Sequence, residues 1–254
     1  MVTAAGREFG ESGAVQIASS GLRISVGNTR ILNRPIEEYE QALGISRERL
    51  LGKKVLDVGS GGGSFLRECA KLGIDAIGID PVYASVFGVN MLGRPYKIDI
   101  LKSETVSLAN KYGAKIVAGV HEALPFKEDT FDFVLGCYSS VAYAAQNYAD
   151  LKQREQAVKR MVEETIRVLK PGGEARITLS ANNSDVEEVK GLVNQILQEA
   201  SKGSNRISWE FLDIQNPATE NTVAHVLELL RIKDRPFLRR EHETEHIIVL
   251  KKKA

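Results

Sequence analysis

A buried strand that runs directly into a series of glycines is the feature that most constrains this chain. Residues 55–63 read Val-Leu-Asp-Val-Gly-Ser-Gly-Gly-Gly, and Ser64 to Lys71 follow with the spacing of a helix. A strand that ends in glycines lets a ligand come close to bare backbone, because no Cβ stands in the way. The following helix presents unpaired N–H groups and the positive end of its dipole at the same point. The segment therefore predicts the first half of a nucleoside-binding βαβ unit.

The second half of that unit ends in a carboxylate. Ile77-Gly78-Ile79-Asp80 is an apolar strand closed by an acidic residue, about 20 residues further on, where a ribose diol is expected. A dinucleotide site would have Gly-x-Gly-x-x-Gly, but Ser64 occupies the third glycine position, and Asp57 lies two residues before the first glycine. A carboxylate at that point repels a pyrophosphate and attracts an ammonium group. Asp57 and Asp80 therefore fit a ligand with an amino acid at one end and a ribose at the other, such as S-adenosylmethionine.

The composition is that of an ordinary globular protein, with 43% hydrophobic and 26% charged residues among 254. The net charge is +1, so no overall field favours nucleic acid or an acidic membrane. No apolar run approaches the ~20 residues that span a bilayer, and the N-terminus lacks the apolar segment of a secretion signal. Cys69 and Cys137 are isolated, which indicates neither a disulfide framework nor a metal clip. We therefore expect a cytoplasmic protein with no membrane partner.

Strands and helices alternate from Lys53 onward. After the first unit we expect strands at 115–118, 131–137, 174–179, 206–213 and 246–250, and helices at 150–169, 184–200 and 222–232. Pro171-Gly172-Gly173 is expected to end the longest helix, and Pro35 and Ser46 to begin two short ones. Near-continuous apolar strands between helices indicate an α/β fold, with a doubly wound, largely parallel sheet and helices on both faces.

Residues 1–34 precede this alternation and are expected to form an N-terminal extension to a main domain of residues 35–254. Apolar residues alternate in patches over residues 14–32, with Gly27-Asn28 between them, which predicts a small hairpin. Such a hairpin could cover the ligand site of the main domain.

Four stretches in the correct order and spacing carry a resemblance to a known family. They are the loop Asp57 to Gly63, the acid Asp80, the segment Glu122-Ala123-Leu124-Pro125-Phe126 with the strand Phe131-Asp132-Phe133-Val134, and the turn Arg167-Val168-Leu169-Lys170-Pro171-Gly172-Gly173. Over about residues 53–180 the chain thus resembles the class I S-adenosylmethionine-dependent methyltransferases, in the small-domain group with "ALPF" and "LKPGG" segments. The resemblance implies a Rossmann-like, mostly parallel seven-stranded sheet whose last strand is antiparallel.

The resemblance also implies which residues bind the cofactor. Those near its methionine end, its ribose, its adenine and its methyl group would be Asp57, Gly59, Ser60, Gly61, Gly63, Asp80, Pro81, His121, Glu122, Ala123, Leu124, Cys137 and Tyr138. The family carries an acidic residue where this chain has Val120, so either His121 or backbone groups would contact the adenine amino group. His121 and Tyr138 are candidates for a catalytic base, which is needed only if the acceptor must lose a proton early.

We therefore expect methyl transfer from S-adenosylmethionine to a nucleophilic atom of a small molecule, with no nucleic-acid partner. Three alternatives stay open. They are an RNA or protein methyltransferase that uses the basic residues between Arg231 and Lys253, a cofactor-binding module without turnover and, third, a nicotinamide oxidoreductase, which is excluded if NAD fails to compete. The acceptor, the methylated atom and the oligomeric state are not specified by these motifs. If the N-terminal hairpin covers the site, deleting residues 1–34 weakens acceptor use more than cofactor binding.

His242-Glu243-Thr244-Glu245-His246 fits the spacing of zinc-hydrolase motifs. Those motifs need a helix, which places ligands one turn apart on a shared face, and a third ligand elsewhere. Here the segment leads into the apolar run Ile247-Ile248-Val249-Leu250, which predicts a strand. We therefore expect no metal site.

Overall fold

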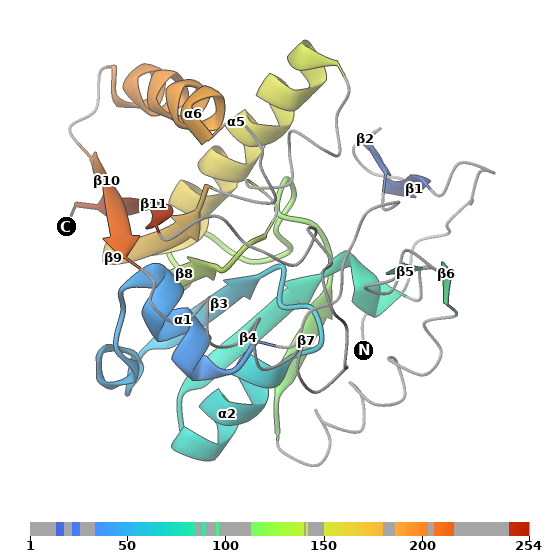
Figure 1. Ribbon diagram of the computed structural model, residues 1–254, viewed down its shortest axis with the longest axis vertical. Coiled ribbons are helices and arrows are strands. Elements are labelled where there is room, and N and C mark those ends of the chain that lie inside the picture. The colour runs from blue at the N-terminus through green and yellow to red at the C-terminus, as the bar shows by residue number, and fades with distance from the viewer. Residues whose placement is uncertain are drawn as a thin grey trace, which may run out of the picture.

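A seven-stranded sheet with the order β10-β11-β9-β8-β3-β4-β7 is the centre of the computed structural model (Figure 1). The structure describes residues 14–17, 22–25, 34–84, 88–89, 95–96, 113–139, 141, 150–179, 186–202, 206–215 and 244–253. The strands of this sheet are β3 (Lys54–Val58), β4 (Asp75–Asp80), β7 (Lys115–Ala118), β8 (Phe131–Gly136), β9 (Leu169–Thr178), β10 (Ile207–Gln215) and β11 (Thr244–Lys252).

The strand pairing confirms the expected mixed sheet. β3, β4, β7, β8 and β9 pair in parallel, whereas β11 is antiparallel to both β9 and β10. The chain passes from β3 to β4 on one side and later returns to β8 on the other side of β3. The order thus reverses between β3 and β8, and in open α/β sheets ligands bind at the carboxyl ends of the strands at such a point.

Helices cover both faces of the sheet, as the alternating pattern predicts. α1 (Ile36–Leu43) and α2 (Ser64–Leu72) lie on one face, and α5 (Leu151–Val168) and α6 (Val186–Ser201) on the other (Figure 1). Successive residues of a strand point to opposite faces, so Leu56 belongs to the core under α5 and α6, and Val55 to the core under α1 and α2. The side chain of Asp57 therefore points toward α1 and α2.

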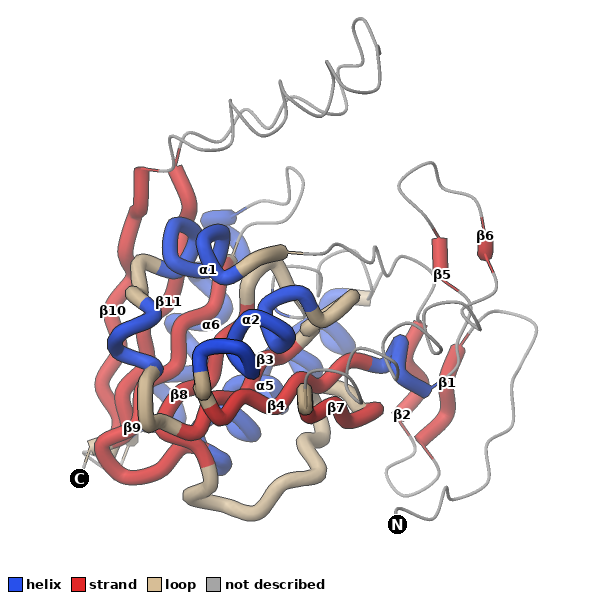
Figure 2. Tube along the Cα trace, turned by 90° about the horizontal axis from the view of Figure 1, so that it is seen from below, coloured by secondary structure: helices blue, strands red, loops and turns tan. Residues whose placement is uncertain are grey.

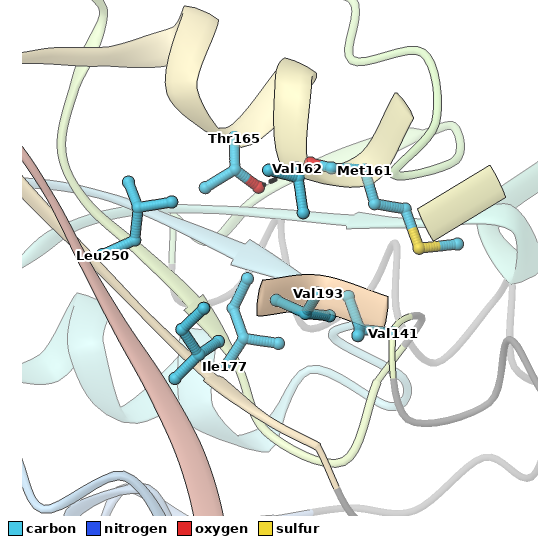
Figure 3. Close-up of a pocket in the computed structure, with 8 residues that line it drawn as sticks. Val141, Met161, Val162, Thr165, Ile177, Val193 and Leu250 are labelled. Atoms are coloured by element: carbon cyan, nitrogen blue, oxygen red, sulfur yellow. Dashed lines mark hydrogen bonds between the residues drawn. The ribbon is translucent and has the colours of Figure 1, made fainter. Parts of the chain in front are cut away.

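A small cavity of about 20 Å³ lies between α5, α6 and the sheet (Figure 3). It is lined by Val141, Met161, Val162, Thr165, Ile177, Val193, Ile248 and Leu250. The Thr165 hydroxyl, the polar group of this lining, donates a hydrogen bond of 2.8 Å to the Met161 carbonyl. A cavity of this size with apolar walls is an imperfection of core packing and offers no room for a ligand.

Two local features differ from the sequence-based expectations. The N-terminal hairpin pairs β1 (Ala14–Ile17) with β2 (Leu22–Ser25), so residues 18–21, and not Gly27-Asn28, connect its strands (Figure 2). The longest helix ends at Val168, within one residue of the expected end, but β9 begins at Leu169 and not at the expected Glu174, because Leu169 already pairs with Phe131. The turn is an irregularity within β9, where the pairing moves from Leu169 to Glu174.

The remaining elements are short. They are η1 (Arg47–Leu50), η2 (Pro81–Ala84), β5 (Gly88–Val89) and β6 (Pro95–Tyr96). Ser46 precedes η1, but its side chain makes no capping hydrogen bond. The helix expected at 222–232 lies outside the described residues.

The described residues give few signs of other kinds of site. None of their helices is both long and apolar enough to span a membrane. Within the same ranges, no three His, Cys, Asp or Glu side chains gather as metal ligands would, and His242 and Glu243 lie outside these ranges. Cys69 and Cys137 are buried and are not bonded to each other.

Candidate active site

The glycine loop after β3 needs glycine for two reasons. Gly59, Gly61 and Gly63 have φ angles of 75°, 53° and 75°, in the left-handed region that side chains rarely adopt. A Cβ on Gly59 would also lie 2.5 Å from the Cβ of Ser139, which follows β8. The loop therefore packs directly on the end of the neighbouring strand, and the ends of β3 and β8 meet at the point where the strand order reverses.

Asp57 is a completely buried carboxylate at the end of β3. Its Oδ1 accepts a hydrogen bond of 2.8 Å from the Tyr39 hydroxyl, whereas its Oδ2 is buried and has no hydrogen-bond partner among the described residues. The pKa of Asp57 is raised to about 7, chiefly by burial and also by the nearby Asp80 carboxylate, against the lowering effects of the Tyr39 hydroxyl and Arg34. An unpaired buried carboxylate oxygen is costly, so this atom favours the approach of a cation.

Asp80 ties the glycine loop to the end of β4. This carboxylate is also buried, and its Oδ2 accepts a hydrogen bond of 2.9 Å from the backbone N–H of Gly61. The hydroxyl groups of Ser60 and Tyr83 lie 2.8 Å apart, which adds a second link between the loop and the segment after β4. The two acidic residues that the sequence singled out therefore flank one rigid loop.

The segment Glu122–Phe126, which follows β7, is held by the last turns of α5. Glu164 accepts a hydrogen bond of 2.7 Å from the Leu124 N–H. Arg167 donates to the carbonyls of Leu124 and Phe126, at 2.9 and 2.7 Å, and forms an ion pair with Glu164 at 2.6 Å. These backbone groups of the loop and the side chains of Glu164 and Arg167 all have hydrogen-bond partners, so the loop has a fixed place beside β4 and β7.

A family described as methyltransferase domain matches residues 56–177. The match spans the glycine loop, both acidic residues, the Glu122–Phe126 segment and most of β9. Residues 56–177 thus belong to a class I S-adenosylmethionine-dependent methyltransferase domain. Its mixed seven-stranded sheet, described above, is the fold that the resemblance implied.

Other comparisons give more distant similarities. Over 100 residues the methyltransferase chain is 33% identical to an uncharacterized protein of Methanocaldococcus jannaschii, a match that covers 38% of this chain and 43% of that protein. The chain thus spans under half the length of this relative. A putative sarcosine dimethylglycine methyltransferase of Galdieria sulphuraria is 14% identical, with a TM-score of 0.48 over 79% of this chain and 78% of its own. The N-methyltransferase NodS of Bradyrhizobium japonicum is 15% identical, with a TM-score of 0.47 over 86% and 96%.

His121 of the methyltransferase is engaged in the protein core. It is buried, and its Nε2 lies 2.8 Å from the Thr165 hydroxyl on α5. Burial lowers its pKa to about 4, so the ring is neutral at physiological pH. This geometry supports packing of the loop on α5 and gives no support to the role of catalytic base.

Tyr138 follows the end of β8 in a strained conformation, with a φ of 50°. Its N–H donates a hydrogen bond of 2.6 Å to the Thr178 hydroxyl, and its ring lies 4.6 Å from the guanidinium carbon of Arg34. On either side of it, Cys137 and Ser139 are buried, and the Ser139 Oγ makes no hydrogen bond. The structure therefore brings Tyr138 and Ser139 to the same edge as the glycine loop.

Three residues of this region, Tyr39, Arg34 and Glu164, were not among the site residues expected from the sequence. Tyr39 has the position of an ordinary core residue on an amphipathic helix. Arg34 stands at the end of the expected extension, before that helix. Glu164 precedes Arg167 by three residues on α5, and this spacing could have indicated an ion pair.

Proposed function

We propose that the protein transfers a methyl group from S-adenosylmethionine to a nucleophilic atom of a small-molecule acceptor. The observation that carries the proposal is the Oδ2 of Asp57, a buried carboxylate oxygen without a partner at the end of β3. The ammonium group of the cofactor's amino acid end has the charge and the donors that this oxygen lacks. Asp80, held in place by the Gly61 N–H, would accept hydrogen bonds from the ribose hydroxyls.

The remaining site residues fit the same ligand. Gly59 offers bare backbone between Asp57 and Ser139, where any side chain would collide. Leu124 is buried in a loop fixed by α5, and would lie against the adenine. When bound, S-adenosylmethionine supplies a methyl group on a positively charged sulfur, which is already electrophilic. The protein then has to align the acceptor and exclude water, and alignment alone can be worth ~7–11 kcal/mol.

The end of β8 supports an acceptor site formed by Tyr138 and Ser139. Arg34, from the segment before α1, lies on the Tyr138 ring, so the N-terminal part of the chain reaches this edge. An electron-rich ring beside a sulfonium group is also favourable. We therefore propose Tyr138 as an acceptor-contacting residue, and we do not retain His121 as a base.

Two of the described lysines near the C-terminus, Lys251 and Lys252, give no support to an RNA substrate. Lys252 donates hydrogen bonds to the carbonyls of Ile166 and Leu169 and pairs with Asp129. Lys251 lies within ion-pair distance of Glu174 and Glu210. These lysines already neutralise acidic groups of the protein, so they offer little charge to phosphates.

Titration calorimetry with S-adenosylmethionine tests the cofactor, with an Asp80→Asn variant and an Asp75→Asn control. Asp75 begins the same strand but is exposed and pairs with Lys115, so its variant should bind as the wild type does. Incubation with methyl-labelled cofactor and separate metabolite, RNA and protein fractions then tests the acceptor. Label should enter the metabolite fraction alone. Absence of binding would refute the proposal, and label in RNA or protein would refute its small-molecule part.

A further inference from the structure

The hydroxyl of Tyr39, a residue outside the glycine-loop motif, contacts the carboxylate of Asp57. Tyr39 lies on α1, 18 residues before Asp57, and its hydroxyl donates a buried hydrogen bond of 2.8 Å to the Asp57 Oδ1. Its ring stacks on Phe65 of α2, with centroids 4.0 Å apart and an angle of 12° between the planes. Two helices therefore hold this hydroxyl in one position.

The helix that carries Tyr39 is itself fastened to the sheet. Arg176 of β9 donates hydrogen bonds of 2.9 and 2.6 Å to the carbonyls of Leu43 and Gly44, at the end of α1. Glu68 of α2 accepts a hydrogen bond of 2.6 Å from the N–H of Ile36, at its beginning. Both ends of α1 are thus fixed, so the direction of the Tyr39 hydroxyl is set by the fold.

Several titratable groups surround the Asp57 carboxylate. On the elements packed around it they are Arg34, Tyr39, Glu68, Cys69, Asp80, Tyr83 and Cys137. Arg34 favours the ionised carboxylate through its charge, whereas Asp80 opposes it. Tyr39 stands apart because it donates directly to one carboxylate oxygen and leaves the other without a partner.

We propose that Tyr39 is a positioning residue for the cofactor. Its hydroxyl occupies the Asp57 Oδ1, directs the Oδ2 to the cofactor's ammonium group and favours the ionised carboxylate that this group requires. The inference rests on the proposed function, and it adds a residue of α1 to the binding machinery.

The role has a consequence for the pH dependence of binding. A protonated Asp57 does not attract an ammonium group, so affinity rises with pH as Asp57 ionises, at about pH 7. Removal of the Tyr39 hydroxyl takes away a hydrogen bond to the ionised form, so ionisation then requires a higher pH. Affinity falls again only at higher pH, where the α-ammonium group of the ligand's free amino acid end loses its proton.

The test is titration calorimetry with S-adenosylhomocysteine from about pH 5 to about pH 9, on either side of the ionisation of Asp57 at about pH 7. The proteins are the wild type, Tyr39→Phe and Phe65→Leu. Phe65→Leu loosens the packing of the same ring and keeps the hydroxyl, so it serves as the matched control. 5′-Methylthioadenosine, which lacks the amino acid end, serves as the ligand control.

For Tyr39→Phe we expect the rising part of the pH profile to move to higher pH and the affinity at pH 7 to fall about ten- to hundredfold. Binding of 5′-methylthioadenosine should be unchanged at every pH. An unmoved rising part in Tyr39→Phe, or an equal shift in Phe65→Leu, would overturn the inference. If the wild type binds neither ligand at any pH, the proposed function itself fails, and the inference with it.

Discussion

Replacement of Asp57 by Asn should make the protein without ligand more stable while it weakens cofactor binding. Asn has the same shape and still offers an oxygen to the Tyr39 hydroxyl, but it carries no charge. In the wild type the charge lies in a completely buried position with one oxygen unpaired. The substitution removes this unfavourable ionised state, and with it the attraction for an ammonium group.

The magnitude follows from the pKa of Asp57, which rises from 3.8 to about 7 in the folded protein. Between these values the unfolded chain has lost the proton and the folded protein still holds it. The free energy of unfolding of the wild type therefore falls with increasing pH, by about 1.4 kcal/mol per unit, or about 4 kcal/mol in all. Below about pH 4 and above about pH 7 this contribution is constant. Asp57→Asn abolishes this pH dependence, so the variant's free energy of unfolding should exceed that of the wild type by an amount that grows between about pH 4 and about pH 7.

Urea denaturation of both proteins without ligand, at about pH 4.5 and about pH 8, measures this difference. Groups that the two proteins share, such as His121, cancel when the variant is compared with the wild type at each pH. Calorimetry with S-adenosylhomocysteine should show an affinity about tenfold or more below that of the wild type. A stability difference that is the same at both pH values would refute the reasoning, because it would mean that Asp57 is ionised throughout.

Three further substitutions, one of them with Gly73→Ala as its control, test other parts of the site. Gly73→Ala should lower the free energy of unfolding by about 1–2 kcal/mol, because of its φ of 73° alone. Gly59→Ala, at a φ of 75°, should lower it by about 1–3 kcal/mol more in urea denaturation, because the new Cβ meets Ser139. Equal costs would show that the loop does not pack on β8. His121→Gln should remove an acid-dependent loss of stability of about 3 kcal/mol, since the folded wild type resists protonation of this ring between its ordinary pKa of 6.5 and about 4. Parallel pH profiles of stability would contradict this. Arg167→Ala should lower stability by about 1–3 kcal/mol and weaken 5′-methylthioadenosine binding, because the Glu122–Phe126 loop loses two hydrogen bonds. Unchanged binding would separate the loop from the adenosine site.

The elements around the glycine loop could be predicted because local and tertiary signals agree there. The strand before Gly59, the helix from Ser64 and the strand 115–118 lie where the apolar pattern places them. The start of the strand after the longest helix could not be predicted so well. The Pro-Gly-Gly turn predicts a strand from Glu174, but pairing of Leu169 with Phe131 draws the chain into the sheet earlier. Long-range pairing of this kind leaves no mark in a local pattern.

The site shows the same division. Asp57 and Asp80 could be selected because their spacing from the glycines has a chemical reason. Tyr39 could not, since a tyrosine on the apolar face of a helix is more often part of the core, and its bond to Asp57 exists only once α1 packs on β3. The motif also does not indicate that the His121 ring is hydrogen-bonded to Thr165 of α5. Side-chain direction in loops depends on neighbours that the motif does not contain.

The hydrogen bonds from Arg176 to the last carbonyls of α1 suggest where the chain could be joined to a foreign segment to engineer new acceptor preferences. Because α1 is hydrogen-bonded to β9, a chimaera should keep α1 and join the foreign sequence before Arg34. A foreign leader joined at Arg34 would leave α1, Tyr39 and the hydrogen bond to Asp57 in place.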